Sequence, residues 1–293
     1  MVPRMDLLRS LLRAELTAVN QQFIHVLALR RLGDQARAAR IYEVDVVDFP
    51  NAMRILDRLA ASGEPIGLPS ELPEPGRPLT ALLQAELRIE DRLHRILATP
   101  GAPDAEAQRL IDAAMAPRAA YRTWLTDALA TEKDDRPERR YPAVDPLFAC
   151  LIAVLEHLMI RAFVARHAGD HAEADRAWAA SGVAMVQVTE FVNALTALDA
   201  VPLGAGAFPP GVPEILGDAD SERALMAAYA RSAAATAAQE AEPSLQAICA
   251  RIVGYTQALL AWQPGRPHPA LGACAPSFRS FAATYEKFVR PRA

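Results

Sequence analysis

Residues 11–30 read LLRAELTAVNQQFIHVLALR, and the fold prediction starts from this stretch. Its core positions recur at alternating steps of three and four, which is the spacing of a helix that turns one apolar face into a bundle. Glu15 interrupts this face with an acid. A carboxylate in a helical core is costly unless it is protonated, paired or bound to a metal. Glu15 is therefore the first candidate for a functional residue.

The composition favours packed helices. The chain has 293 residues, of which 52 % are hydrophobic and 6 % aromatic, and this is enough apolar material for two cores. The formal net charge of −4 offers no basic surface for nucleic acid. The longest apolar run, 147–155, is too short to span a bilayer, and the N-terminus lacks the long apolar segment of a signal peptide. We expect a cytoplasmic protein with no membrane span.

Long helices are expected wherever the apolar periodicity persists, with Pro50 kinking or splitting the second helix and a bend near Pro117 in the fourth. The segments 63–78 and 201–217 are rich in proline and glycine and read as long crossovers, which allow the next helix pair to lie parallel to the first. The charged segment 132–143 is the best domain boundary. The expected helices span 6–31, 35–62, 79–98, 104–131, 145–167, 172–199, 221–240, 243–262 and 277–289.

The two halves of the chain look like a divergent repeat. Leu32-Gly33-Asp34 in the first half corresponds to Ala168-Gly169-Asp170 in the second, and each crossover follows the second helix of its half. This correspondence places Leu151 opposite Glu15, so the second half lacks the first acid. The prediction is an all-α fold with one bundle over 1–131 and a second, degenerate bundle with an extra C-terminal helix over 144–293.

Two further acids lie on core-facing stripes of the first half. Asp48 lies on the stripe of the second helix, and Glu90 lies on that of the third, one turn after Glu86. Acids that project from facing helices of one bundle are the arrangement that binds paired metal ions. Glu15, Asp48 and Glu90 are therefore candidate metal ligands.

The run ELTAVNQQFIH, residues 15–25, resembles the first helix of bacterioferritins, which belong to the ferritin-like superfamily. Gly33-Asp34 and the stretch from Arg58-Leu59 to Gly63-x-Pro65 also fit, so the likeness covers roughly residues 5–130. The resemblance implies tandem ferritin-like four-helix bundles. It also implies a di-iron centre built from a glutamate on each of the first and third helices and a Glu-x-x-His motif on each of the second and fourth.

The chain departs from the family pattern where the metal would bind. Asp48-Phe49-Pro50-Asn51 and Arg118-Ala119-Ala120-Tyr121 stand at the two Glu-x-x-His positions, so both histidines are missing and a guanidinium replaces one carboxylate. Phe49 stands where the haem-binding methionine is expected, so we expect no haem. Two divalent ions in a core of low dielectric need about four anionic ligands, and only three acids remain.

Two hypotheses for the site follow from these departures. In the first, Arg118 stands in for the metal and forms an internal ion pair with the acids, while Tyr121 completes the hydrogen bonds. In the second, a single-metal or unusual two-metal site survives, holds iron or manganese through the acids, and recruits His94. We read His25 as a hydrogen-bonded structural histidine. The acids in both hypotheses are Glu15, Asp48 and Glu90.

The leading functional prediction is a ferritin-like protein with a degraded di-iron site and no cofactor. It would act as a non-ferroxidase binding or assembly component for an unidentified protein or small molecule. The alternative is a di-iron or single-metal carboxylate oxidoreductase that acts on a small organic substrate, so whether the protein is an enzyme stays open. A homo-oligomer also stays open, although the second bundle would take the place of a two-fold partner.

Overall fold

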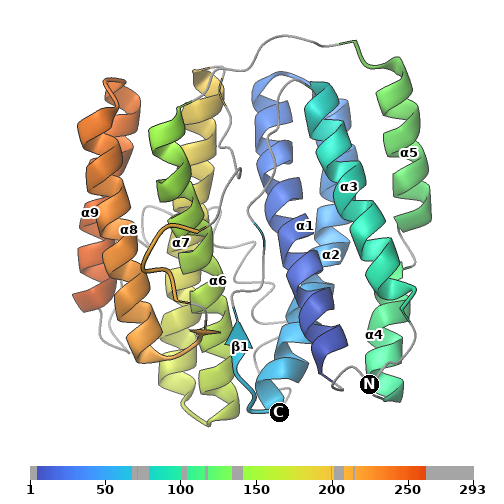
Figure 1. Cartoon of the computed structure of the whole chain (residues 1–293), viewed down its shortest axis with the longest axis horizontal. Coiled ribbons are helices and arrows are strands. Elements are labelled where there is room, and N and C mark those ends of the chain that lie inside the picture. The colour runs from blue at the N-terminus through green and yellow to red at the C-terminus, as the bar shows by residue number, and fades with distance from the viewer. Residues whose placement is uncertain are drawn as a thin grey trace. The chain divides into compact units, whose positions relative to one another are not determined.

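The protein is all-α, and the computed structural model in Figure 1 shows its helices. It describes residues 5–67, 71, 79–99, 104–115, 118–133, 141–198, 200, 208–213 and 215–261. The predicted helix over 277–289 lies outside these residues.

The chain forms two compact units. The first takes in Met1–Leu59, Pro69–Arg140 and Leu195–Gly206, and the second takes in Ala60–Leu68, Tyr141–Ala194 and Ala207–Ala293.

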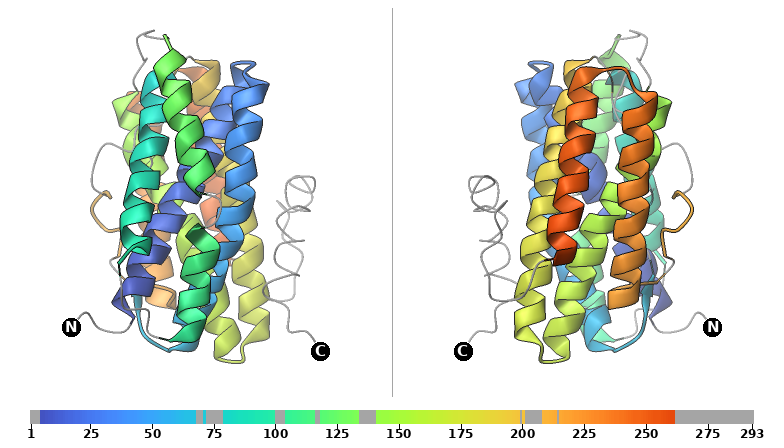
Figure 2. Two further views of the ribbon diagram at one scale, coloured as in Figure 1. Left: turned by 90° about the vertical axis from the view of Figure 1, so that its right-hand side faces the viewer. Right: turned by 90° about the vertical axis from the view of Figure 1, so that its left-hand side faces the viewer.

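Among the described residues, the five helices α1 to α5 build the first unit. Side chains from α1, α2, α3 and α5 meet in one apolar cluster that includes Val26, Ile41, Leu83 and Leu125. The single helix predicted over 104–131 is two helices, α4 and α5, which lie one above the other beside α3 (Figure 2). The bounds are α1 Asp6–Arg31, α2 Gln35–Ala61, α3 Leu79–Leu97, α4 Ala105–Met115 and α5 Arg118–Thr131.

Of the kink or split predicted at Pro50, the split does not occur, because α2 is one helix that runs through this residue. Proline removes one backbone hydrogen bond and crowds the preceding turn. Asp48 and Asn51, which flank it, are both buried. Tertiary packing on either side of Pro50 therefore holds the helix together despite the missing bond.

In its described residues, the second unit consists of four α-helices, a short 3-10 helix and a short two-stranded sheet. In the sheet, Ile66 of β1 pairs with Leu216 of β2 in antiparallel register, and both side chains are buried. Neither strand was predicted, because each is a two-residue piece of a crossover that was read as irregular. The bounds are β1 Ile66–Gly67, η1 Pro142–Val144, α6 Asp145–His167, α7 His171–Ala197, β2 Ile215–Leu216, α8 Ala219–Gln239 and α9 Pro243–Ala261.

Helix α6 is the central helix of the second unit. Among the described residues, the stretch Pro142–His167 is long and apolar enough to cross a membrane by length and composition. However, 89 % of its most apolar window is buried inside the protein, as expected for a core helix. Helix α8 packs against both α6 and α9.

The turn between α1 and α2 has the same geometry as the turn between α6 and α7. Gly33 has φ +84° and Gly169 has φ +81°, a left-handed conformation that glycine adopts without steric cost. The N–H of the following aspartate donates to a carbonyl of the preceding helix at 2.9 Å in both turns. Helices α2 and α7 each contain 27 residues and each begin two residues after the glycine.

Candidate functional site

Arg118, the first residue of α5, lies buried among three acids of the first unit. Its Nη2 donates to Glu15 Oε2 at 2.8 Å and to Asp48 Oδ1 at 3.0 Å, and its Nη1 donates to Glu90 Oε1 at 2.7 Å. Its Nε donates to the carbonyl of Ala114 on α4 at 2.9 Å. The guanidinium therefore uses four of its five N–H groups and joins α1, α2, α3 and α4 to α5.

One guanidinium cannot neutralise three buried carboxylates, so the acids retain protons. Burial raises the pKa of both Glu15 and Glu90 to about 8, against the opposing effect of Arg118, and the neighbouring charge of Asp48 raises both further. Burial also raises the pKa of Asp48. The pKa of Arg118 lies above its usual range, because attraction from the three acids outweighs its own burial. Arg118 thus stays charged while the acids share protons at neutral pH.

A second group of buried polar residues lies beside this cluster. The ring Nδ1 of His25 is 2.6 Å from Glu86 Oε1, and the hydroxyl of Tyr121 donates to Glu86 Oε2 at 2.9 Å. His25 is thus a hydrogen-bonded histidine of the interior. Tyr121 was expected to complete the hydrogen bonds around Arg118, but it contacts Glu86 instead, because it lies one turn further along α5. Gln22 Nε2 donates to Asp48 Oδ2 at 3.2 Å.

The structure does not bring His94 to the acids. Its side chain is exposed although it follows the fully buried Glu90 by four residues on α3. Four residues advance a helix by slightly more than one turn, which moves His94 off the edge of the buried stripe. Across the described part of the chain, no group of three or more His, Cys, Asp and Glu side chains is arranged to hold a metal ion.

Asp45 is an acid of this site that the sequence reading did not select. It lies one turn before Asp48 on α2, and burial raises its pKa to about 8, with smaller contributions from the charges of Asp48 and Glu86. Its Oδ1 is buried without a hydrogen-bond partner in the described structure. The sequence pattern could have identified Asp45, because this residue lies on the same core-facing stripe of the helix as Asp48.

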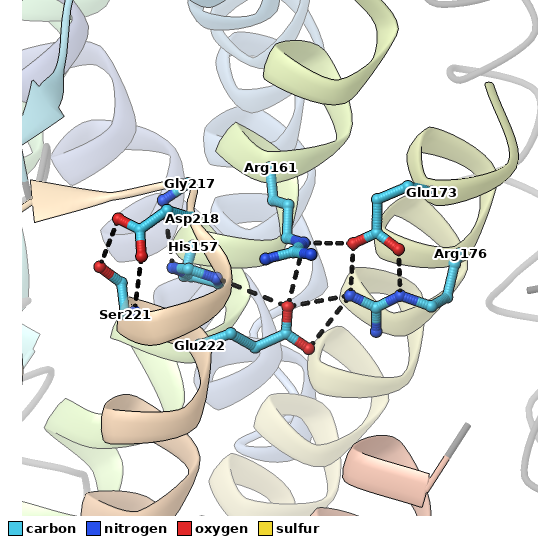
Figure 3. Close-up of polar contacts among 8 residues, drawn as sticks. All are labelled: His157, Arg161, Glu173, Arg176, Gly217, Asp218, Ser221 and Glu222. Atoms are coloured by element: carbon cyan, nitrogen blue, oxygen red, sulfur yellow. Dashed lines mark hydrogen bonds and ion pairs between the residues drawn. The ribbon is translucent and has the colours of Figure 1, made fainter. Parts of the chain in front are cut away.

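The second unit has a polar cluster of different character, shown in Figure 3. Arg161 of α6 and Arg176 of α7 both contact Glu222 of α8, at 3.1 and 2.9 Å, and both also pair with Glu173. Burial raises the pKa of Glu222, but the contacts with His157 and the two arginines outweigh this and hold it at about 2. The positive charges of the two arginines therefore balance the negative charges of the two glutamates, so both glutamates stay ionised.

His157 is tied to the loop that leads into α8. Its Nδ1 accepts a hydrogen bond from the backbone N–H of Gly217 at 3.3 Å, so this nitrogen is unprotonated. Its Nε2 lies 3.8 Å from Glu222 Oε2. The sequence reading missed this cluster, although a signal existed. Gly33 and Gly169 are 136 residues apart, and the same offset relates His25 to Arg161 and Glu86 to Glu222. His25 contacts Glu86 in the first unit, and Arg161 contacts Glu222 in the second.

Comparisons with known proteins found no matching family model, no similar curated protein and no similar solved structure. The fold and the site together define an all-α protein with a buried cluster of one guanidinium and several carboxylates.

Proposed function

We propose that the first unit is a ferritin-like four-helix bundle in which Arg118 has replaced the metal ions, and that the protein is a non-ferroxidase binding or assembly component. The observation that carries this proposal is the contact of one guanidinium with Glu15, Asp48 and Glu90 at 2.7–3.0 Å. In the resemblance of the first half to bacterioferritins, these three acids are the ones that remain of the expected metal ligands. The partner is an unidentified protein or small molecule.

The chemistry of the cluster supports replacement of the metal over coexistence with it. Arginine is a permanent cation whose planar fork fits carboxylate oxygens. Metal binding at the same oxygens would require Arg118 to move and the acids, whose pKa values are raised, to release their protons. Both steps oppose metal binding at neutral pH. The alternative of a carboxylate oxidoreductase requires iron or manganese at these oxygens, and no contact in the described residues favours it.

The second unit supports a tandem arrangement of related bundles. Its first turn and its second helix match those of the first unit in geometry and length. Leu151, opposite Glu15 in the repeat, is buried among apolar side chains of α6. We propose that this unit is a degenerate ferritin-like repeat that lost the acids of the centre, and that the contact of Arg161 with Glu222 stands where the first unit has the His25–Glu86 pair.

Metal analysis tests the proposal directly. Protein produced with added iron or manganese and purified without chelators should contain well under one equivalent of metal per chain. It should also oxidise added Fe²⁺ no faster than buffer does. Two equivalents of bound metal in the wild-type protein would refute the proposal.

A gain-of-metal variant provides the matched control. Arg118→Glu with Tyr121→His restores Glu-x-x-His on α5, and Asn51→His creates Asp-x-x-His on α2. We expect this triple variant to bind more iron than the wild-type protein under identical conditions. A variant with Arg118→Gln alone removes the guanidinium without adding a ligand, and should stay nearly metal-free.

A further inference from the structure

An open surface cavity of about 390 Å³ lies in the second unit between the start of α6 and the C-terminal half of α8. This volume falls within the range of small-molecule sites in proteins. Much of its wall consists of proline and alanine, which lose no side-chain rotamer freedom when a ligand packs on them. Thr236 on α8 donates to the carbonyl of Ala143 at 2.8 Å and ties the two sides together. The prolines in the wall are Pro142, Pro146, Pro209 and Pro210.

Among the described residues, Arg231 is the charged residue that lines this cavity. It is exposed, and no carboxylate among the described residues forms an ion pair with it. Arg161 and Arg176 of the same unit differ in this respect, because Glu173 and Glu222 neutralise them (Figure 3). Within the described structure, Arg231 therefore offers a positive charge to a ligand without a competing carboxylate.

Gly211 allows the guanidinium of Arg231 to lie against the loop that borders the cavity. A Cβ atom at Gly211 would lie 2.8 Å from Arg231 Nη2, which is closer than atoms can pack. Gly211 also has φ +93°, a conformation that side chains disfavour. Ser232 and Gln239 add a hydroxyl and an amide to the same wall. The polar groups of the described wall thus come from α8.

We propose that this cavity binds a small organic carboxylate with an apolar body. The carboxylate pairs with Arg231, since a guanidinium presents two parallel N–H donors to two carboxylate oxygens. The apolar body packs against the prolines and alanines. A single cation in a largely apolar cavity matches one negative charge better than the several charges of a nucleotide. This inference is independent of whether the first unit has lost its metal.

Calorimetric titration of the full chain with benzoate and with benzamide tests the proposal. The two probes share a ring and differ in charge, so we expect benzoate to bind at one site and benzamide to bind at least tenfold more weakly. Arg231→Gln should weaken benzoate binding by about tenfold to hundredfold, the usual effect of losing a charged hydrogen bond. Arg223→Gln is the matched control, because Arg223 is an exposed arginine of the same helix outside the cavity. It should leave benzoate affinity unchanged.

A second variant separates binding in the cavity from attraction to any surface arginine. Ala235 lines the cavity and is exposed, so Ala235→Phe should fill the space while the helix and Arg231 are kept. We expect this variant to lose benzoate binding and to keep the circular dichroism spectrum of the wild-type protein. The proposal is overturned if benzoate does not bind, if Arg231→Gln or Ala235→Phe binds it as tightly as wild type, or if benzamide binds equally well.

Discussion

Arg118 Nη2 lies 2.8 Å from Glu15 Oε2, and this contact joins α5 to α1 across 103 positions of sequence. Both side chains are almost completely buried. A buried ion pair adds little net stability relative to apolar residues, because desolvation offsets the attraction. Removal of one partner is different, since it leaves an uncompensated charge in the core. The cluster therefore makes the first unit sensitive to the charge state of each member.

The first prediction concerns the guanidinium. Arg118→Met should reduce the unfolding free energy by about 3–5 kcal/mol at pH 9, because the ionised acids then lack their cation. The loss should be smaller at pH 6, below the pKa of about 8 of Glu15 and Glu90, where these acids are protonated and uncharged. Urea unfolding can be followed through the fluorescence of Trp124, whose ring stacks on that of Tyr121 with the two ring centroids 5.6 Å apart. The other tryptophans are changed to phenylalanine, so that Trp124 alone reports the unfolding of the first unit. A loss below about 1 kcal/mol at pH 9 would contradict a buried, ionised cluster.

The second prediction is a pH dependence of the first unit. The pKa of Glu15 and of Glu90 is about 8 in the folded protein, against an ordinary value of 4.5 for a glutamate in water. The folded state therefore binds more protons than the unfolded state between these values, so the stability contributed by these groups falls as the pH rises from about 4.5 to 8. Glu15→Gln and Glu90→Gln should flatten this decline. Denaturation midpoints measured from pH 5 to pH 9 provide the test, and a stability that rises across this interval would exclude raised pKa values.

The third prediction concerns the second unit, where the sign is opposite. The pKa of Glu222 is lowered to about 2, so its contribution is complete above the unfolded pKa and is lost as the pH falls toward 2. Glu222→Gln should cost about 2–3 kcal/mol at pH 7, because Arg161 and Arg176 lose a shared charged acceptor. Glu190→Gln is the control. Glu190 forms an exposed pair with Arg251, and its loss should cost less than about 1 kcal/mol. Equal losses for the two variants would contradict a special role of Glu222.

Apolar periodicity predicted the helices well where the pattern was long. The bounds expected for the first helix, 6–31, and for the fifth, 145–167, agree with α1 and α6. The same periodicity placed Glu15, Asp48 and Glu90 on one seam, and Arg118 contacts all three. The ferritin-like relation itself stays a prediction.

Features that depend on long-range pairing could not be predicted in the same way. Strands β1 and β2 pair only two residues each, so neither shows a repeating pattern of its own. The contacts of Arg161 with Glu222 depend on the register between α6 and α8, which a single helix pattern does not specify. The prediction that His94 lies near the acids was wrong, because the buried face of a helix is narrow. The four-residue step from the buried Glu90 takes His94 out of that face and into solvent.

The last prediction compares two glycines of the second unit that both have positive φ. Gly169 has φ +81° and open space where the Cβ atom of an alanine would lie, so Gly169→Ala should cost only the backbone strain, about 1–2 kcal/mol. Gly217 has φ +102°, and a Cβ there would lie 3.0 Å from Ile160 Cγ2, against the core helix α6.

Gly217→Ala should therefore cost about 1–3 kcal/mol more than Gly169→Ala, because crowding against α6 adds to the strain. The backbone N–H of Gly217 also donates to His157 Nδ1, so a shift of the backbone at residue 217 would break the hydrogen bond that orients the His157 ring. Thermal unfolding of both variants gives the difference, and the NMR signals of the His157 ring report the hydrogen bond. Equal losses of stability with an unchanged ring signal would show that the approach of Gly217 to α6 does not constrain the start of α8.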